Sequence, residues 1–94
     1  MDFTSVYNTH EKTIFEAVTA AAPRYPGIAD DPGLLADVAC VALNRMPPHY
    51  IRHSADLAFF TTEKERQAIR RNVEESVDFA FGYVQARHVM AARR

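Results

Sequence analysis

The 94-residue chain carries eleven Lys and Arg residues against twelve Asp and Glu residues, so its formal net charge is −1. This balance excludes the global cationic field that draws proteins onto nucleic acid without sequence preference. A single cysteine, Cys40, excludes an intramolecular disulfide and any zinc or iron–sulfur site built from several cysteines. A hydrophobic content of 48% with only three glycines is typical of one folded domain, which we expect to span residues 1–94.

The start of the chain and its apolar runs bear on where the protein resides. The sequence begins Met1-Asp2-Phe3 with no basic segment leading into an apolar stretch, so no secretory signal is predicted. The longest uninterrupted apolar run, Val38 to Leu43, is far shorter than the roughly 20 residues that a membrane-spanning helix needs. We therefore expect a soluble, cytoplasmic protein without a membrane partner.

The first predicted helix runs from about Asn8 to Ala22. Asn8, followed three residues later by Glu11, has the form of an N-terminal cap pair, and apolar residues then recur at helical spacing. Pro23 ends this helix because proline disrupts the hydrogen bonding of a helix interior. Two prolines and a glycine within residues 23–31 predict a loop.

The second predicted helix covers residues 34–45 and is opened by Asp31-Pro32. Aspartate accepts hydrogen bonds from free N–H groups at a helix start, and proline suits the first helical position. The helix is apolar almost all round, so we expect it to be buried on most sides. On this basis Cys40 is a buried structural thiol rather than a nucleophile. Pro47-Pro48 ends the helix.

Residues 47–60 are the least regular part of the sequence. The segment after Pro48 is predicted to be extended, since its tyrosine and isoleucine favour a strand. Residues 55–60 are compatible with either a short helical turn or a loop. An extended chain sends His49 and His53 to opposite faces, so we do not expect them to bind a metal together.

The third predicted helix has the clearest start in the chain. Thr62 and Glu65 form a capping box, and nothing interrupts the helix before about Ala92. Thirty residues make a helix about 45 Å long, which exceeds what the core of so small a domain needs.

Two apolar stripes run along this long helix. One consists of Ile69, Val73, Val77, Ala80 and Val84, and the other of Phe79, Tyr83, Ala86 and Met90. One stripe suits the chain's own core, and the other suits a second copy of the chain, because an isologous dimer is the commonest way to cover such a surface. The predicted architecture is an all-α homodimer. Each chain has three main helices, of which the C-terminal one is long, and a short extended segment after Pro48.

Chemistry-bearing side chains concentrate in ten residues around the diproline. Arginine offers a planar fork for phosphate or for the edge of guanine, and tyrosine and histidine offer stacking faces for bases. A nearby carboxylate, Asp37 or Asp56, would accept the N–H groups of a guanine. The predicted ligand-binding residues are Asn44, Arg45, His49, Tyr50, Arg52, His53 and Asp56.

The same residues have plainer interpretations, which stay open. Arg45 and Asn44 suit the end of a helix, where a cation favours the helix dipole and asparagine caps the last carbonyl groups. The whole segment also suits a polar turn between two helices. Common nucleotide-binding, metalloprotease and serine-hydrolase motifs are absent, so no catalytic residue and no enzymatic activity are predicted.

The run from Asp37 to Tyr50, and above all its Ala-Leu-Asn-Arg-Met-Pro-Pro-His-Tyr end, resembles the bacterial late competence development protein ComFB family. Met46 replaces the usual leucine, a near-isosteric change. The resemblance extends from the first helix to about Val84. It implies a small helical homodimer, and cyanobacterial relatives are regarded as receptors for cyclic dinucleotides, especially cyclic di-GMP. Some members bind zinc through a cysteine cluster, which this chain lacks, so neither zinc nor another cofactor is expected.

Two hypotheses follow. In the first, the protein is a non-catalytic signalling protein that binds a cyclic dinucleotide, cyclic di-GMP above all, through the residues around the diproline. In the second, the same surface docks a partner protein in a dimeric adaptor linked to competence or pilus function, and no nucleotide binds. The resemblance to a competence family does not by itself imply contact with DNA, and no direct DNA binding is expected.

Overall fold

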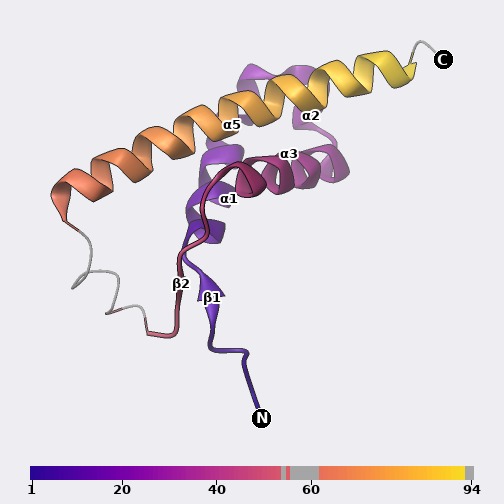
Figure 1. Cartoon of the computed structure of the whole chain (residues 1–94). Helices are drawn as coiled ribbons and strands as arrows, with labels where there is room; N and C mark the ends of the chain where they lie inside the picture. The colour runs from indigo at the N-terminus through magenta and orange to yellow at the C-terminus, as the bar shows by residue number, and fades with distance from the viewer. Residues whose placement is uncertain (54, 56–61, 93–94) are drawn as a thin grey trace.

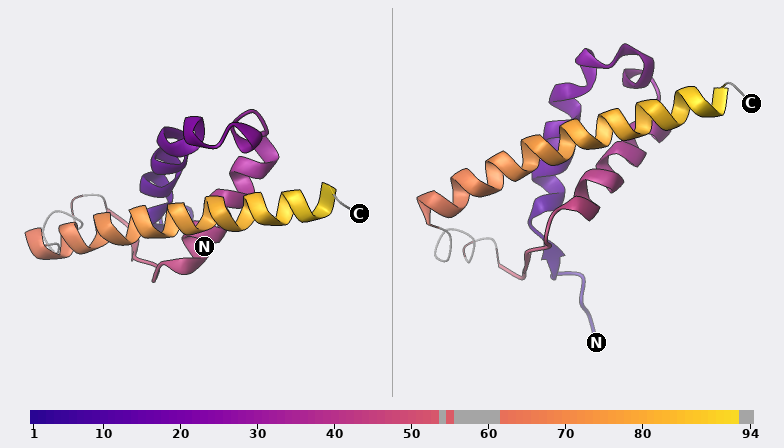
Figure 2. Two further views of the ribbon diagram at one scale, coloured as in Figure 1. Left: turned by 90° about the horizontal axis from the view of Figure 1, so that it is seen from above. Right: turned by 45° about the horizontal axis from the view of Figure 1, so that its top comes forward.

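Three helices form the body of the protein. The computed structural model describes residues 1–53, 55 and 62–92. Helix α5 (Glu63–Ala92) lies across α1 (His10–Ala21) and α3 (Pro32–Arg45), and extends beyond them at both ends (Figures 1 and 2). A strand pair of two residues each lies below the helices. The predicted all-α class and the extended segment after Pro48 are therefore confirmed.

The N-terminal segment differs from the prediction. Helix α1 begins at His10, and Tyr7–Asn8 form strand β1, which pairs antiparallel with β2 (Tyr50–Ile51). In this pairing Tyr7 lies opposite Ile51, and Asn8 lies opposite Tyr50. The helix was predicted to begin at Asn8, but it begins at His10. Asn8 is instead part of β1 and pairs with β2, about 40 residues later in the sequence.

The side chain of Asn8 connects the two-strand ribbon of β1 and β2 to the start of α1. Its Oδ1 accepts hydrogen bonds from the backbone N–H of His10, at 3.2 Å, and of His49, at 3.0 Å. The backbone N–H of Thr9 in turn donates to the carbonyl of His49 at 2.8 Å. Asn8 therefore satisfies the free N–H of His10 at the start of α1 and also fixes the segment that leads into β2. The predicted cap pair of Asn8 and Glu11 is wrong, because the N-cap residue is Thr9 and Asn8 lies in β1.

The predicted loop between α1 and α3 contains two short helical turns. These are the 3₁₀ turn η1 (Ala22–Arg24) and the one-turn helix α2 (Pro26–Ala29). Ile28 is fully buried, and the ring of Tyr25 stacks on Phe81 with 4.2 Å between ring centroids. The connection therefore closes one end of the core rather than running free over the surface.

Helix α3 begins as predicted but is less buried than predicted. Asp31 Oδ1 accepts the N–H of Leu34 at 3.1 Å, and Met46 turns to an extended conformation before Pro47. Only Val38, Ala39 and Ala42 of this helix are buried. Cys40 is exposed, so its assignment as a buried thiol is wrong. Two packed neighbours cover only part of a helix, and Cys40 lies on the uncovered part.

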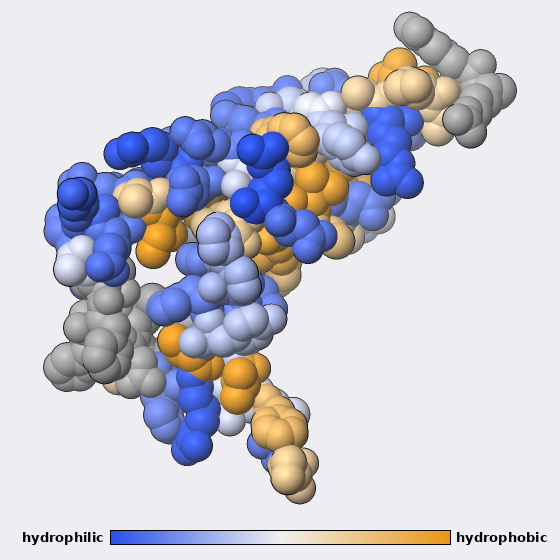
Figure 3. Space-filling view, viewed as in Figure 1, coloured by the Kyte–Doolittle hydropathy of each residue, from blue (hydrophilic) through white to orange (hydrophobic). Residues whose placement is uncertain are grey.

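Helix α5 matches the prediction closely. Thr62 Oγ1 accepts the N–H of Glu65 at 3.1 Å, which is the expected cap. The inward stripe joins the core, where Phe81, also from this helix, is completely buried. The second stripe stays exposed in the single chain. Hydrophilic residues cover much of the visible surface of α5 in Figure 3, and apolar residues emerge where it meets the elements below.

The protomer is elongated. Its radius of gyration is 15.1 Å, whereas a compact domain of this length has a radius of about 12 Å. The difference follows from α5, which is longer than the layer that α1 and α3 form beneath it (Figure 2).

Asn8→Ala should lower the free energy of unfolding by about 1–3 kcal/mol, because two backbone N–H groups lose their acceptor. Asn8→Asp keeps an acceptor oxygen and should stay closer to the wild type. Urea unfolding followed by circular dichroism measures both. The matched control is Asn72→Ala at an exposed position of α5. An Asn8→Ala chain as stable as this control would show that Asn8 does not hold the ribbon in place.

Candidate functional site

Five of the predicted ligand-binding residues are exposed along the turn that leads from α3 through β2: Asn44, Arg45, Tyr50, Arg52 and His53. We call the last four of them the α3–β2 surface. Arg45 is the last residue of α3, and Tyr50 is the first of β2, with its side chain 62% exposed. The diproline between them prevents the helix from continuing and lets the chain turn into the ribbon.

Arg45 contacts an aromatic ring of another helix. Its guanidinium carbon lies over the ring of Phe79 of α5, 3.9 Å from the ring centroid. A cation over a ring face is attracted by the ring quadrupole, which favours this one position of a flexible side chain. The flat face of the Arg45 guanidinium is thus held against Phe79 at the α3–α5 junction. Its N–H groups lie in the guanidinium plane. Phe79 was predicted only as part of an apolar stripe, and no pattern in the sequence indicates its contact with Arg45.

Asn44 makes a contact within its own helix. Its side-chain amide donates to Cys40 Sγ one turn earlier, at 3.7 Å. The end of α3 is closed instead by the backbone, where the N–H of Met46 donates to the carbonyl of Leu43 at 3.3 Å. The structure thus gives Asn44 a role on the surface of α3 rather than at its terminal carbonyl groups. Asp56, the remaining predicted residue, lies outside the described residues.

His49 joins the turn to the start of α1. Its ring nitrogen Nδ1 lies 3.2 Å from Thr9 Oγ1, and its backbone bonds to Thr9 and Asn8. The side chain is half-buried rather than freely presented. When the Thr9 hydroxyl donates to Nδ1, the ring proton resides on Nε2, which is then a hydrogen-bond donor.

His10, which was not predicted as a site residue, is buried next to the contact between His49 and Thr9. Its ring centroid lies 6.2 Å from that of His49. Burial lowers the pKa of His10 below the usual 6.5, and the proximity of His49 lowers it further, while the backbone of Pro47 acts in the opposite direction. A position in the first turn of α1 also disfavours a positive charge, because the helix dipole is positive there. His10 is therefore held neutral near pH 7.

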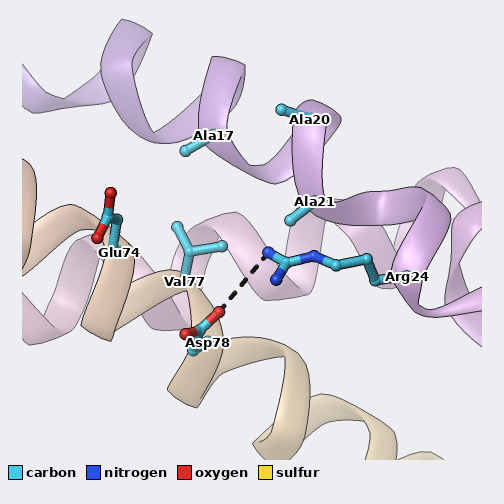
Figure 4. A pocket seen from close by; sticks show the side chains of 7 residues that line it. All are labelled: Ala17, Ala20, Ala21, Arg24, Glu74, Val77 and Asp78. Carbon is cyan, nitrogen blue, oxygen red and sulfur yellow. Dashed lines mark ion pairs between the residues drawn. The ribbon is translucent and has the colours of Figure 1, made fainter.

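Hollows lie elsewhere on the chain. One, of about 450 Å³, lies between α1 and α5, where alanine side chains face Val77 and the Arg24–Asp78 ion pair, with 3.8 Å between its charged atoms (Figure 4). Both members of this pair are largely exposed, so it contributes little. A second, apolar groove lies between α1 and α3 and includes Phe15, Leu35 and Leu43. Neither contains a residue of the α3–β2 surface.

The described part of the chain offers no metal centre. Among residues 1–53, 55 and 62–92, no three His, Cys, Asp or Glu side chains are grouped closely enough to hold a metal ion. None of the helices in these ranges is both long and apolar enough to cross a membrane.

The fold and the surface together define a small all-α protein in which a diproline turn and a two-strand ribbon present arginine and aromatic side chains. The family model described as "Late competence development protein ComFB" matches residues 7–88. The chain therefore belongs to the ComFB family, a competence-related family, and the resemblance found in the sequence is confirmed. No curated protein matches the chain significantly.

The buried His10 should make stability depend on pH. Because the unfolded chain binds the His10 proton more tightly than the folded chain, the free energy of unfolding should fall as the pH drops through and below 6.5. Urea unfolding between about pH 7.5 and pH 5 measures this slope. His10→Gln should flatten the slope, whereas His88→Gln, on the exposed part of α5, should leave it unchanged. Equal slopes in all three chains would contradict a neutral, buried His10.

Proposed function

We propose that this ComFB-family protein is a non-catalytic bacterial signalling protein that binds a cyclic dinucleotide, cyclic di-GMP above all, in the cytoplasm. The observation that carries the proposal is the exposure of two arginines, a tyrosine and a histidine along the α3–β2 surface, with Arg45 held in place over Phe79. This set of side chains matches the parts of the ligand.

The ligand is a compact dianion with two guanine bases. Arg45 and Arg52 suit its phosphates or the guanine edge, because guanidinium binds both through paired N–H groups. Tyr50 supplies a stacking face for a base, and His53 and the Nε2 atom of His49 supply further polar contacts. Cyclic di-AMP has the same charge and shape, so these residues select the class of ligand more strongly than the base.

The proposed active form is a homodimer. Its support is the elongated protomer and the exposed second stripe of α5. A near-twofold ligand fits a twofold protein, since each arginine and each aromatic ring is then present twice.

A second candidate function rests on the apolar groove between α1 and α3. Phe15 is half exposed there, beside the partly buried Leu35 and Leu43. Such a groove suits the apolar face of a partner helix. The protein would then be a dimeric adaptor linked to competence or pilus function, with an as yet unidentified protein partner and no nucleotide.

Calorimetric titration with cyclic di-GMP, cyclic di-AMP and GTP, in parallel and at two salt concentrations, tests the proposal. We expect saturable binding of a cyclic dinucleotide, no binding of GTP, and weaker binding at higher salt. Arg45→Gln and Arg52→Gln should each weaken binding about tenfold, because each removes a charged hydrogen-bond donor.

Arg70→Gln is the matched control, since it removes the same charge from an exposed position of α5 outside the α3–β2 surface. Three flat titrations would reject the receptor and favour the adaptor. Wild-type binding by both arginine variants would reject the assigned residues while keeping the function.

Light scattering at micromolar concentration tests the dimer independently of any ligand. We expect twice the mass of one chain, 10.6 kDa, because the exposed stripe of α5 needs a covering partner. A monomeric mass throughout this range would contradict the homodimer.

A further inference from the structure

Phe79 connects two surfaces: it contacts Arg45 of the α3–β2 surface and is itself part of an exposed apolar stripe on α5. Its ring carries the guanidinium of Arg45, and its centroid lies 6.0 Å from that of Tyr83 in a stacked arrangement. The first contact joins Phe79 to the α3–β2 surface. The second joins it to the next residue of the exposed stripe of α5. We call this stripe the α5 seam and define it as Phe79, Tyr83, Ala86 and Met90.

The α5 seam has the spacing of a helix-packing surface. Its residues follow one another at intervals of four, three and four, which is the a/d pattern of a coiled coil. The side chains of Phe79, Tyr83 and Met90 are 46%, 48% and 65% exposed in the protomer. The spacing therefore indicates another helix as the covering element, because only a helix matches this period along its length.

The seam is complementary to itself. When two copies of α5 pack antiparallel about a point between Tyr83 and Ala86, Phe79 of each lies opposite Met90 of the other. Tyr83 then lies opposite the small Ala86. Aromatic rings contact methionine sulfur favourably, and large residues fill the space left by small ones. The neighbouring Gly82 supports this arrangement, because an added Cβ there would meet no atom of residues 1–53, 55 and 62–92 within 4 Å. Packing within these described residues thus does not explain this helix-weakening residue.

The seam alone makes a modest interface. An exposed aromatic side chain presents about 150–250 Å², so three half-exposed large residues offer roughly 300 Å², against about 800 Å² per partner in a standard interface. Additional contacts are needed for a tight dimer. Arg45 lies at the edge of the seam, where a bound anion would supply them.

We propose that the α5 seam and the α3–β2 surface are energetically coupled through Phe79, so that pairing of two copies and binding of the cyclic dinucleotide strengthen each other. This inference rests on the proposed function. Phe79 is a positioning residue: packing of the second copy restrains its ring, and the restrained ring holds Arg45 where its N–H groups meet the phosphate. Because coupling is reciprocal, the ligand must tighten the dimer by the factor by which the dimer tightens the ligand.

Met90→Glu tests the coupling at a distance. Met90 is eleven residues from Phe79, about 16 Å along the helix, and it is exposed, so the substitution should not disturb the protomer. We expect a weaker dimer by sedimentation velocity and at least threefold weaker binding of cyclic di-GMP by calorimetry. Val89→Glu is the matched control, since it adds the same charge at the neighbouring exposed position outside the seam and should change neither value.

A second pair of variants tests the ring itself. Phe79→Leu keeps the seam apolar but removes the ring beneath Arg45, so it should weaken cyclic di-GMP binding and leave ligand-free dimerisation within about twofold. Phe79→Tyr keeps the ring and should restore binding. Equal loss in both variants would show that Phe79 acts through packing alone, which contradicts its positioning role.

The outcomes separate the coupling from the function. A Met90→Glu chain that no longer dimerises but binds cyclic di-GMP like the wild type overturns the coupling and leaves the receptor intact. Wild-type affinity that stays constant when the protein is diluted below its dimer dissociation constant has the same meaning. Absence of binding of both cyclic di-GMP and cyclic di-AMP by the wild-type protein overturns both proposals.

Discussion

The side-chain oxygen of Asn8 is the atom on which the arrangement of the candidate site depends. It accepts one N–H from the start of α1 and one from the segment that enters β2, two parts of the chain that are about 40 residues apart. The strand pair is only two residues long, and so short a ladder is not stable by itself. Asn8 therefore converts a weak ribbon into a fixed support for the α3–β2 surface.

The elements predicted correctly are those whose signals are local. Asp31 and Thr62 cap the helices as their neighbours in sequence indicate, and the 3.6-residue period of α5 identifies its inward face. Strand β1 has no such signal, because two residues form a strand only through their distant partner. Cys40 was misplaced for a related reason: an apolar helix shows that burial is favourable but not which side its neighbours cover.

Only part of the candidate site was predicted, again because the signals in a sequence are local. Its arginines and aromatic residues are close in sequence, so composition alone drew attention to Arg45, Tyr50 and Arg52. The neighbours that give these residues their setting come from elsewhere: Phe79 from the middle of α5, and Thr9 and His10 from the start of α1. Contacts of this kind follow from the tertiary fold, and no spacing rule in a single sequence reveals them.

The first two turns of α5 have a different consequence. Every residue from Thr62 to Ala68 is exposed, so the core does not hold these turns in place. Their helical structure rests on the Thr62 cap, because the local Glu63–Arg66 ion pair, with 3.6 Å between its charged atoms, is largely exposed and contributes little. Such an end can gain or lose whole turns without opening the core. This overhang is consequently where the protein best tolerates insertions or fused domains, at a distance from both the ribbon and the seam.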